Sequence, residues 1–252
     1  MIRFATWNIW NTQGEIRRWR DLIPDVLLQQ APDIVVIQEV SLDGDGLPQS
    51  FRLAQSLGLP FERYFFSGDW RGREEGLAIL SRYPMKRHVR ALLSPGSDMM
   101  GRSVCGATLD TPDGWLDVYT THYAHALNDQ AGRVKQAEET AEFVIRMAGI
   151  ASSPAMVLAG DLNDIPNSPP LTLLRRRLGL IDALDGLSSN DRITFSAANP
   201  NVDPRLGADR CLDYVLHSER CVAREHRLFG VTRSGEFASD HFGVLVSLEL
   251  SA

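Results

Sequence analysis

The sequence predicts an α/β protein in which two packed β-sheets carry helices on their outer faces, in one domain spanning residues 1–252. Segments with strand character outnumber those with helical periodicity, and the two kinds occur in mixed order. Several strand segments also follow one another without long helices between them, which indicates antiparallel pairing. With 252 residues and 44% hydrophobic residues, the chain can bury a sizeable core.

The predicted strands are short apolar runs bounded by turn residues. In chain order they cover residues 2–7, 34–38, 76–81, 84–93, 103–109, 116–121, 155–159, 211–216, 221–229 and 244–250. The run at 155–159 is apolar at every position, as expected of a strand that is buried on both faces.

The predicted helices cover residues 16–30, 129–148 and 171–178, where apolar residues recur at helical spacing. Pro24 should kink or split the first helix, because proline has no N–H to donate and its ring clashes with the preceding turn. The second helix carries an apolar stripe formed by Val134, Ala137, Ala141, Val144 and Ile145.

Composition narrows the class of protein. A formal net charge of −6 disfavours broad electrostatic binding to nucleic acid, although a local basic rim would suffice for an enzyme. No apolar run approaches the roughly 20 residues of a transmembrane helix. Met1 leads directly into a strand, so we expect no secretion signal. The three cysteines are odd in number and are typical of reduced packing residues, which predicts a cytoplasmic protein.

Polar residues that bind metals or transfer protons lie at the ends of these strands. They are Asn8, Gln38, Glu39, His122, Asp161, Asn163, Asp213, Asp240 and His241. Adjacent strand ends can converge in space, so these residues are candidates for lining one cleft. Too few Cys and His residues are clustered for a tetrahedral zinc site.

Each candidate also has a purely structural interpretation. Asn8 would cap a turn, and Glu39 would be a solvated strand end. His122 would be a packed or exposed histidine without a chemical role. GDLND (160–164) and Ser239-Asp240-His241 would be ordinary turns, because their residues favour turns.

Seven segments together resemble the successive motifs of the endonuclease/exonuclease/phosphatase superfamily, the group around deoxyribonuclease I. They are TWNIW (6–10), IQEV (37–40), GLAILSRYP (76–84), TTH (120–122), GDLND (160–164), RCLDYVL (210–216) and SDHFG (239–243). The resemblance implies a four-layered α/β sandwich with two central mixed or antiparallel β-sheets flanked by helices, and an active site at one end of the sheets.

A metal-dependent phosphoesterase needs hard oxygen ligands, because Mg²⁺ binds carboxylates, water and substrate oxygens and neutralises the phosphoryl charge. The resemblance implies that Glu39 is a ligand of Mg²⁺ or Mn²⁺. It places Asn8 and Asp240 near this metal or a second ion. Asn8 is also a candidate substrate-binding residue.

The resemblance further implies the residues that act on water and phosphate. Asp161 would be the general base that orients and deprotonates the attacking water, and Asn163 would help to hold water or phosphate. His122 and His241 would donate hydrogen bonds to the phosphoryl oxygens. Asp213 would hold His241, and Glu75 would hold His122. Arg102 would contact the substrate phosphate, or would be a surface charge.

Three functions remain open at this point. The first is a Mg²⁺- or Mn²⁺-dependent phosphodiesterase acting on a small or lipid-derived phosphodiester, because residues 121–143 and 160–174 are similar to neutral sphingomyelinases. The second is a nuclease or DNA-end-processing enzyme, because ITFSAANPN (193–201) and its neighbours resemble type-two tyrosyl-DNA phosphodiesterases. The loop with Trp70, Arg71 and Arg73 would then grip single strands. The third is a catalytically silent binding module of the same fold.

Overall fold

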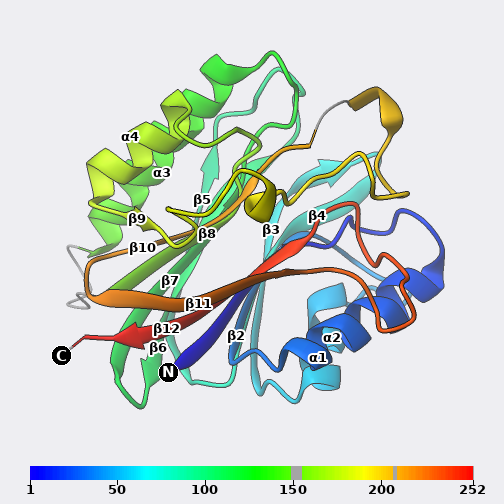
Figure 1. Cartoon of the computed structure of the whole chain (residues 1–252), viewed down its shortest axis with the longest axis horizontal. Helices are drawn as coiled ribbons and strands as arrows, with labels where there is room; N and C mark the ends of the chain where they lie inside the picture. The colour runs from blue at the N-terminus through cyan, green and yellow to red at the C-terminus, as the bar shows by residue number, and fades with distance from the viewer. Residues whose placement is uncertain (149–154, 207–208, 252) are drawn as a thin grey trace.

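Two six-stranded β-sheets form the centre of the computed structural model, which describes residues 1–148, 155–206 and 209–251 (Figure 1). The first sheet has the order β11-β12-β1-β2-β4-β3. Its strands are β11 (Cys221–Phe229), β12 (Gly243–Leu250), β1 (Ile2–Asn8), β2 (Ile34–Ser41), β4 (Arg73–Ser81) and β3 (Phe61–Trp70). The second sheet has the order β5-β6-β7-β8-β10-β9. Its strands are β5 (Met85–Leu93), β6 (Arg102–Thr111), β7 (Gly114–His122), β8 (Ala155–Asp161), β10 (Asp213–His217) and β9 (Ile181–Asp182).

Helices cover the outer face of each sheet. A π-helical turn (Arg18–Leu22), α1 (Ile23–Gln30) and α2 (Gln49–Leu57) lie on the first sheet. The second sheet carries α3 (Gln130–Ala148) and α4 (Pro169–Leu178) on the opposite side of the molecule (Figure 1). This arrangement confirms the predicted four-layered sandwich. No helix among the described residues is long and apolar enough to span a bilayer.

Alternation along the strands explains why the central runs are apolar at every position. In β2, Ile34 and Val36 face the layer between the two sheets, whereas Val35 and Ile37 face α1 and α2. β8 does the same: Val157 packs between the sheets and Leu158 packs against α3 and α4. Each central strand is therefore buried on both faces, which is the pattern of a sheet covered on both sides.

The predicted elements are largely found, and three further elements were not predicted. The first predicted helix is split as expected, with Pro24 in the first turn of α1, where its missing N–H breaks no helical hydrogen bond. Helix α2 and strand β3 were not predicted. Strand β9 has only two residues, Ile181–Asp182, and was also missed.

Candidate active site

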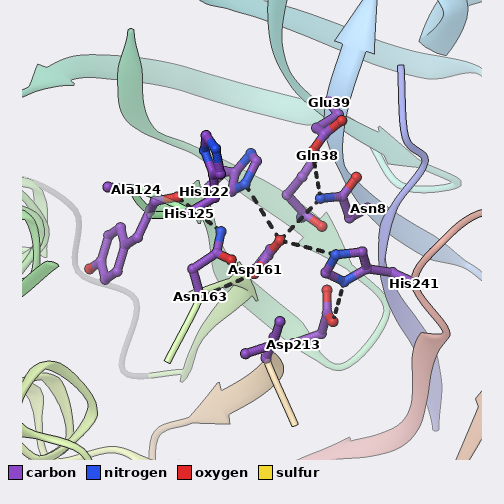
Figure 2. Close-up of polar contacts among 12 residues, drawn as sticks. Asn8, Gln38, Glu39, His122, Ala124, His125, Asp161, Asn163, Asp213 and His241 are labelled. Carbon is purple, nitrogen blue, oxygen red and sulfur yellow. Dashed lines mark hydrogen bonds and ion pairs between the residues drawn. The ribbon is translucent and has the colours of Figure 1, made fainter. Parts of the chain in front are cut away.

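The strand pairings bring the predicted polar residues to one end of the sandwich. In the first sheet Asn8 lies beside Gln38 in the parallel pair β1–β2. In the second sheet His122 lies beside Asp161 in the parallel pair β7–β8, and Asp213 lies beside Asp161 in the antiparallel pair β8–β10. The convergence expected from the strand ends is therefore present in the structure (Figure 2).

A cleft of about 360 Å³ opens at this end of the sheets. The residues around it come from both sheets and from the loops that connect their strands. Those predicted from the sequence are Glu39, Glu75, Arg102, His122, Asp161, Asn163, Asp240 and His241. Asn8 and Asp213 are completely buried and do not line the cleft. They lie behind it, in contact with residues that do.

Asp161 is the central carboxylate of the cleft. Its Oδ2 lies 3.4 Å from Nε2 of His122 and 3.7 Å from Nε2 of His241, and accepts a hydrogen bond from Nδ2 of Asn8 at 3.0 Å (Figure 2). Burial raises the pKa of Asp161 to about 6, against the lowering effect of the His241 charge and the Asn8 hydrogen bond. The carboxylate is thus held by donors on several sides, at the end of a rigid central strand.

The two histidines beside Asp161 differ in protonation. For His241, burial disfavours the charged form, but Asp213 and Asp161 outweigh it and raise its pKa well above the usual range. The Nδ1 of His241 donates to Oδ2 of Asp213 at 2.8 Å. For His122, burial and the charge of Arg102 lower the pKa well below the usual range. His241 is therefore the cationic imidazole and His122 the neutral one.

Arg102, and not Glu75, is the partner of His122. Nη1 of Arg102 lies 3.0 Å from Nδ1 of His122. Because a guanidinium only donates, Nδ1 must be the acceptor, and the proton of neutral His122 sits on Nε2, facing Asp161. Glu75 instead accepts a hydrogen bond from Asn11 at 3.2 Å. The predicted contact between Glu75 and His122 is not formed among the described residues.

Glu39 owes its direction to a backbone irregularity. The pairing of β2 with β4 shifts register between Ile37 and Val40, and Glu39 between them has a φ of 56°, in the left-handed region. A β-bulge of this kind turns a side chain out of the strand's regular alternation, and positive φ in a non-glycine residue is strained. The bulge lets the buried strand present a carboxylate to the cleft.

Asparagine side chains hold this carboxylate in place. Asn8 donates to Oε1 of Glu39 at 3.1 Å, and Asn11 donates to Oε2 at 2.9 Å. The Oδ1 of Asn8 accepts the backbone N–H of Trp10. Both the nitrogen and the oxygen of the Asn8 amide are therefore engaged, in contacts that position Glu39, Asp161 and the loop after β1. The Asn8 side chain does not line the cleft.

Three acidic side chains on one side of the cleft, Glu39, Glu75 and Asp240, fit a cation, and we call them the Glu39 wall. The same Nδ2 of Asn11 contacts Glu39 and Glu75, so the two carboxylates lie close together. Burial and the charge of Glu39 raise the pKa of Glu75 to about 8. Burial, with the charges of Glu39 and Asp161, raises the pKa of Asp240 to about 7, although the His241 charge opposes the rise. A bound divalent cation would relieve this repulsion, and oxygen donors are the ligands Mg²⁺ prefers.

A second group of ligand-type atoms lies next to it. One ligand atom each from Asp161, Asp213 and His241 lie within 4.8 Å of one another. Asp213 and His241 already share a short hydrogen bond, so these atoms are engaged with each other. We therefore interpret this group as a proton-handling arrangement, and the Glu39 wall as the better match to a metal.

Asn163 faces the cleft from the loop after β8, in the left-handed conformation with φ 50°. Its backbone N–H donates to Oδ1 of Asp161, and its side chain donates to the carbonyl of Tyr123. It thus joins the ends of β7 and β8 (Figure 2).

Several residues around the cleft were missed by the sequence analysis. Asp98 accepts from Nη2 of Arg102 at 3.0 Å and lies 2.9 Å from Nδ1 of His125, and so fixes Arg102 beside His122. Asn11, Phe195 and Arg210 also belong to this region. Asn11, Asp98, Phe195 and Arg210 lie outside the named strands and helices, and the only signal was the density of polar residues near the motifs.

The loop with Trp70, Arg71 and Arg73 was a candidate for binding single-stranded nucleic acid. Arg71 lines the cleft, and Arg73 donates to Oγ1 of Thr12. The side chain of Trp70 lies outside the part of the chain that the structure describes.

The profile of the endonuclease/exonuclease/phosphatase family matches residues 5–241. The chain therefore belongs to this family, whose members are hydrolases of phosphoester bonds, and the predicted family is confirmed.

Solved structures agree on the fold. An endonuclease/exonuclease/phosphatase from Beutenbergia cavernae DSM 12333 has a TM-score of 0.76 at 24% identity, over 100% of this chain and 72% of that one. Truncated Caenorhabditis elegans TDP2 has a TM-score of 0.73 at 17% identity, over 98% and 96%. A mannosyl-6-phosphatase from Bacteroides thetaiotaomicron VPI-5482 has a TM-score of 0.74 at 19% identity, over 99% and 100%. At these identities the likeness shows the fold. No curated protein matches the chain.

Proposed function

We propose that the protein is a Mg²⁺- or Mn²⁺-dependent phosphodiesterase in which Asp161 is the general base. The observation that carries this proposal is the position of Asp161 between a cationic and a neutral imidazole, beside a separate wall of carboxylates. We further propose that residues 1–252 form one catalytic domain. A reducing, cytoplasmic setting is also proposed, supported by three free, buried thiols, Cys105, Cys211 and Cys221.

The metal would be held by Glu39 and Asp240, with Glu75 beside them. When bound, it would neutralise phosphoryl oxygens and so reduce their repulsion of the incoming nucleophile. Asn8 takes the role of a positioning residue in this proposal, because its amide contacts Glu39 and Asp161 from behind the cleft.

The chain's own residues supply the remaining steps. Asp161 accepts the proton of the attacking water at Oδ2, the oxygen that faces both histidines. Protonated His241 donates from Nε2 to an oxygen of the phosphoryl group, and Asp213 holds its other nitrogen. Neutral His122 donates from Nε2 to a phosphoryl oxygen as well, because Arg102 occupies its Nδ1 and so fixes the tautomer. Among the described residues, the buried Nε of Arg102 has no hydrogen-bond partner, and Arg102, which lines the cleft, would contact a substrate phosphate.

A small or lipid-derived substrate is the first choice. Leu127 and Leu206 are exposed and line the cleft, and Met99 on the neighbouring loop is 77% exposed. Apolar side chains around a charged cleft suit a phosphodiester with an apolar portion. The likeness to neutral sphingomyelinases is part of this proposal.

A nuclease or DNA-end-processing enzyme is the second candidate, supported by Arg71 in the cleft lining. A catalytically silent binding module is the third.

The test is hydrolysis of bis(p-nitrophenyl) phosphate and of p-nitrophenyl phosphate, with Mg²⁺ and with a chelator. We expect metal-dependent cleavage of the diester. Cleavage of the monoester alone would replace the proposal with a phosphatase, the activity named for the Bacteroides thetaiotaomicron structure. Competition by single-stranded DNA would favour the second candidate. Metal binding without hydrolysis of any phosphoester would favour the third.

A further inference from the structure

Arg210 and Arg102 line the same cleft, on opposite sides of His122 and Asp161. Arg210 precedes β10, whereas Arg102 begins β6. In the sheet order β6-β7-β8-β10, the strands that carry His122 and Asp161 lie between them. The cleft therefore has a guanidinium on each flank.

The backbone of Arg210 is fixed by the segment that supports His241. Its N–H donates to the carbonyl of Phe195 at 2.8 Å, and its carbonyl accepts the N–H groups of Thr194 and Phe195, each at 3.0 Å. The guanidinium carbon lies 5.0 Å from the centroid of the Phe195 ring, and that ring is 5.0 Å from the imidazole of His241. Arg210 is thus stacked one ring away from a proposed catalytic residue.

The charge of Arg210 is not neutralised by a carboxylate. Among the described residues it forms no ion pair; Nη2 donates to the carbonyl of Leu206 at 3.2 Å, and the buried Nε has no partner. The nearby acids are engaged elsewhere, Asp203 by Arg205 and Asp209 by Ser196. Burial lowers the pKa of Arg210 from its ordinary value, although Asp161 attracts its charge.

The buried arginines Arg133 and Arg192 are each paired with a carboxylate, whereas buried Arg18 donates to five backbone carbonyls. Arg133 lies 2.9 Å from Asp164, and Arg192 lies 2.5 Å from Asp182. A partly buried guanidinium with an unsatisfied N–H is costly unless a ligand completes it. Because Arg210 borders the cleft, that ligand is an anionic group of the bound substrate.

We propose that Arg210, stacked on Phe195, binds a second phosphate group of the substrate, beside the phosphodiester that is cleaved. This inference rests on the proposed phosphodiesterase function. A planar guanidinium matches a phosphate with two parallel hydrogen bonds, and stacking holds it in that orientation. A nucleotide strand and a phosphorylated small alcohol would both present such a group.

The experiment measures binding by calorimetry in the presence of Mg²⁺. Wild type, Arg210→Gln and the control Arg205→Gln are titrated with thymidine 3′,5′-bisphosphate and with thymidine 5′-monophosphate. Arg205 is the matched control because it belongs to the neighbouring segment, is exposed and is paired with Asp203. Inositol 1,4-bisphosphate is the second bisphosphate, and the better bound of the two identifies a nucleotide or a non-nucleotide source.

We expect Arg210→Gln to weaken bisphosphate binding by about tenfold or more, as expected for loss of a charge-assisted hydrogen bond. Monophosphate binding should change by less than about threefold, since the scissile-phosphate site is intact. Arg205→Gln should bind both like wild type, and Arg210→Lys should keep part of the preference. If Arg210→Gln retains the wild-type ratio of bisphosphate to monophosphate affinity, the proposal is overturned.

The same variants separate this inference from the proposed function. Bis(p-nitrophenyl) phosphate has one phosphate and reports on the proposed function alone, and the control Arg205→Gln should hydrolyse it at the wild-type rate. If the wild type hydrolyses no diester but Arg210→Gln still loses the bisphosphate preference, the proposed function fails and the anion subsite stands. An unchanged melting temperature of Arg210→Gln excludes misfolding as the cause.

Discussion

At the scale of single residues, the chemistry of the cleft depends on which side chain is hydrogen-bonded to Nδ1 of His122 and of His241. Despite burial, Asp213 and Asp161 raise the pKa of His241, whereas burial and the charge of Arg102 lower the pKa of His122. The two rings therefore face the Asp161 carboxylate in different charge states. A base between two donors needs to be a carboxylate that stays ionised in a buried place. Burial raises the pKa of Asp161, and the charge of His241 followed by the hydrogen bond from Asn8 to Oδ2 opposes the rise.

Replacing Asp161 with Asn is therefore expected to remove the base while keeping the shape of the side chain. Turnover of a diester substrate should fall by about 10²- to 10⁴-fold. The melting temperature should be equal to or above that of wild type, because a buried charge is removed and Asn8 still finds an amide oxygen. Steady-state kinetics and a thermal melt by circular dichroism check both parts. Near-normal turnover with an unchanged melt would refute the assignment of the base.

Asp98, which is not part of the Glu39 wall, gives a prediction on how the stability of the protein depends on pH. Burial alone would raise its pKa, but the hydrogen bond to His125 and the charge of Arg102 outweigh burial and hold the pKa of Asp98 below its ordinary value. A depressed carboxyl pKa contributes stability above the unfolded pKa of about 3.9 and loses it as the pH falls toward the folded pKa. Asp98→Asn should therefore be less stable than wild type at pH 7, and the gap should shrink below about pH 4.

Urea unfolding of both proteins between pH 7 and pH 3 measures this gap. The control is Asp113→Asn, at an exposed position on the β6–β7 turn. A gap for Asp98→Asn that is constant across the range would contradict the prediction.

At the scale of secondary structure elements, α3 supports the loops that carry the site. Arg133 of α3 is buried; it forms an ion pair with Asp164, just after β8, and donates to the carbonyls of Ala124 and Ala126, just after β7. One side chain therefore ties the helix to the loops after His122 and Asp161. This contact explains why Arg133 stands among apolar residues on the inner face of the helix.

Arg133→Met should cost about 3–5 kcal/mol of stability, because it leaves the Asp164 carboxylate buried without its partner. Pairing it with Asp164→Leu should recover part of that loss. Chemical denaturation of the single and double variants provides the free energies. A double variant that is no more stable than Arg133→Met would show that the ion pair is not the source of the effect.

The strand ends of the site were predictable because the chemistry and the fold signal coincide there. Apolar runs marked β1, β2, β7, β8 and β12, and Glu39, His122, Asp161 and His241 follow or precede them directly. The partner of His122 was predicted wrongly, because Arg102 begins the neighbouring strand β6 and the sequence does not show which charged side chain reaches the imidazole. Asn11, Asp98 and Arg210 lie on loops, where spacing carries no information on direction. Helix α2 was missed because few of its positions are apolar, and the edge strand β3 because its apolar and polar residues follow no regular alternation.

At the scale of the whole molecule, the site exists only because the two sheets are held in register with each other. The layer between them is largely apolar, but polar side chains of the two sheets meet across it near the site. Nε2 of Gln38, from β2, donates to Thr6 Oγ1 in its own sheet at 3.2 Å and to Thr120 Oγ1 in the other sheet at 3.0 Å. Asn8 makes the second such crossing, to Asp161. Directional polar contacts of this kind fix relative position in a way that apolar packing does not.

Gln38→Leu should therefore destabilise the protein by about 1–3 kcal/mol, because it leaves buried threonine hydroxyls without a partner. It should also lower turnover, since Glu39 and Asp161 come from different sheets and their separation depends on this bridge. In the triple variant Thr6→Val, Gln38→Leu and Thr120→Val, the unsatisfied groups are gone and most of the stability should return. The turnover defect should persist, because the apolar replacements fill the space without restoring directional contacts between the sheets. Urea unfolding and diester kinetics on the two variants separate these effects, and recovery of both quantities together would show that packing alone sets the register of the site.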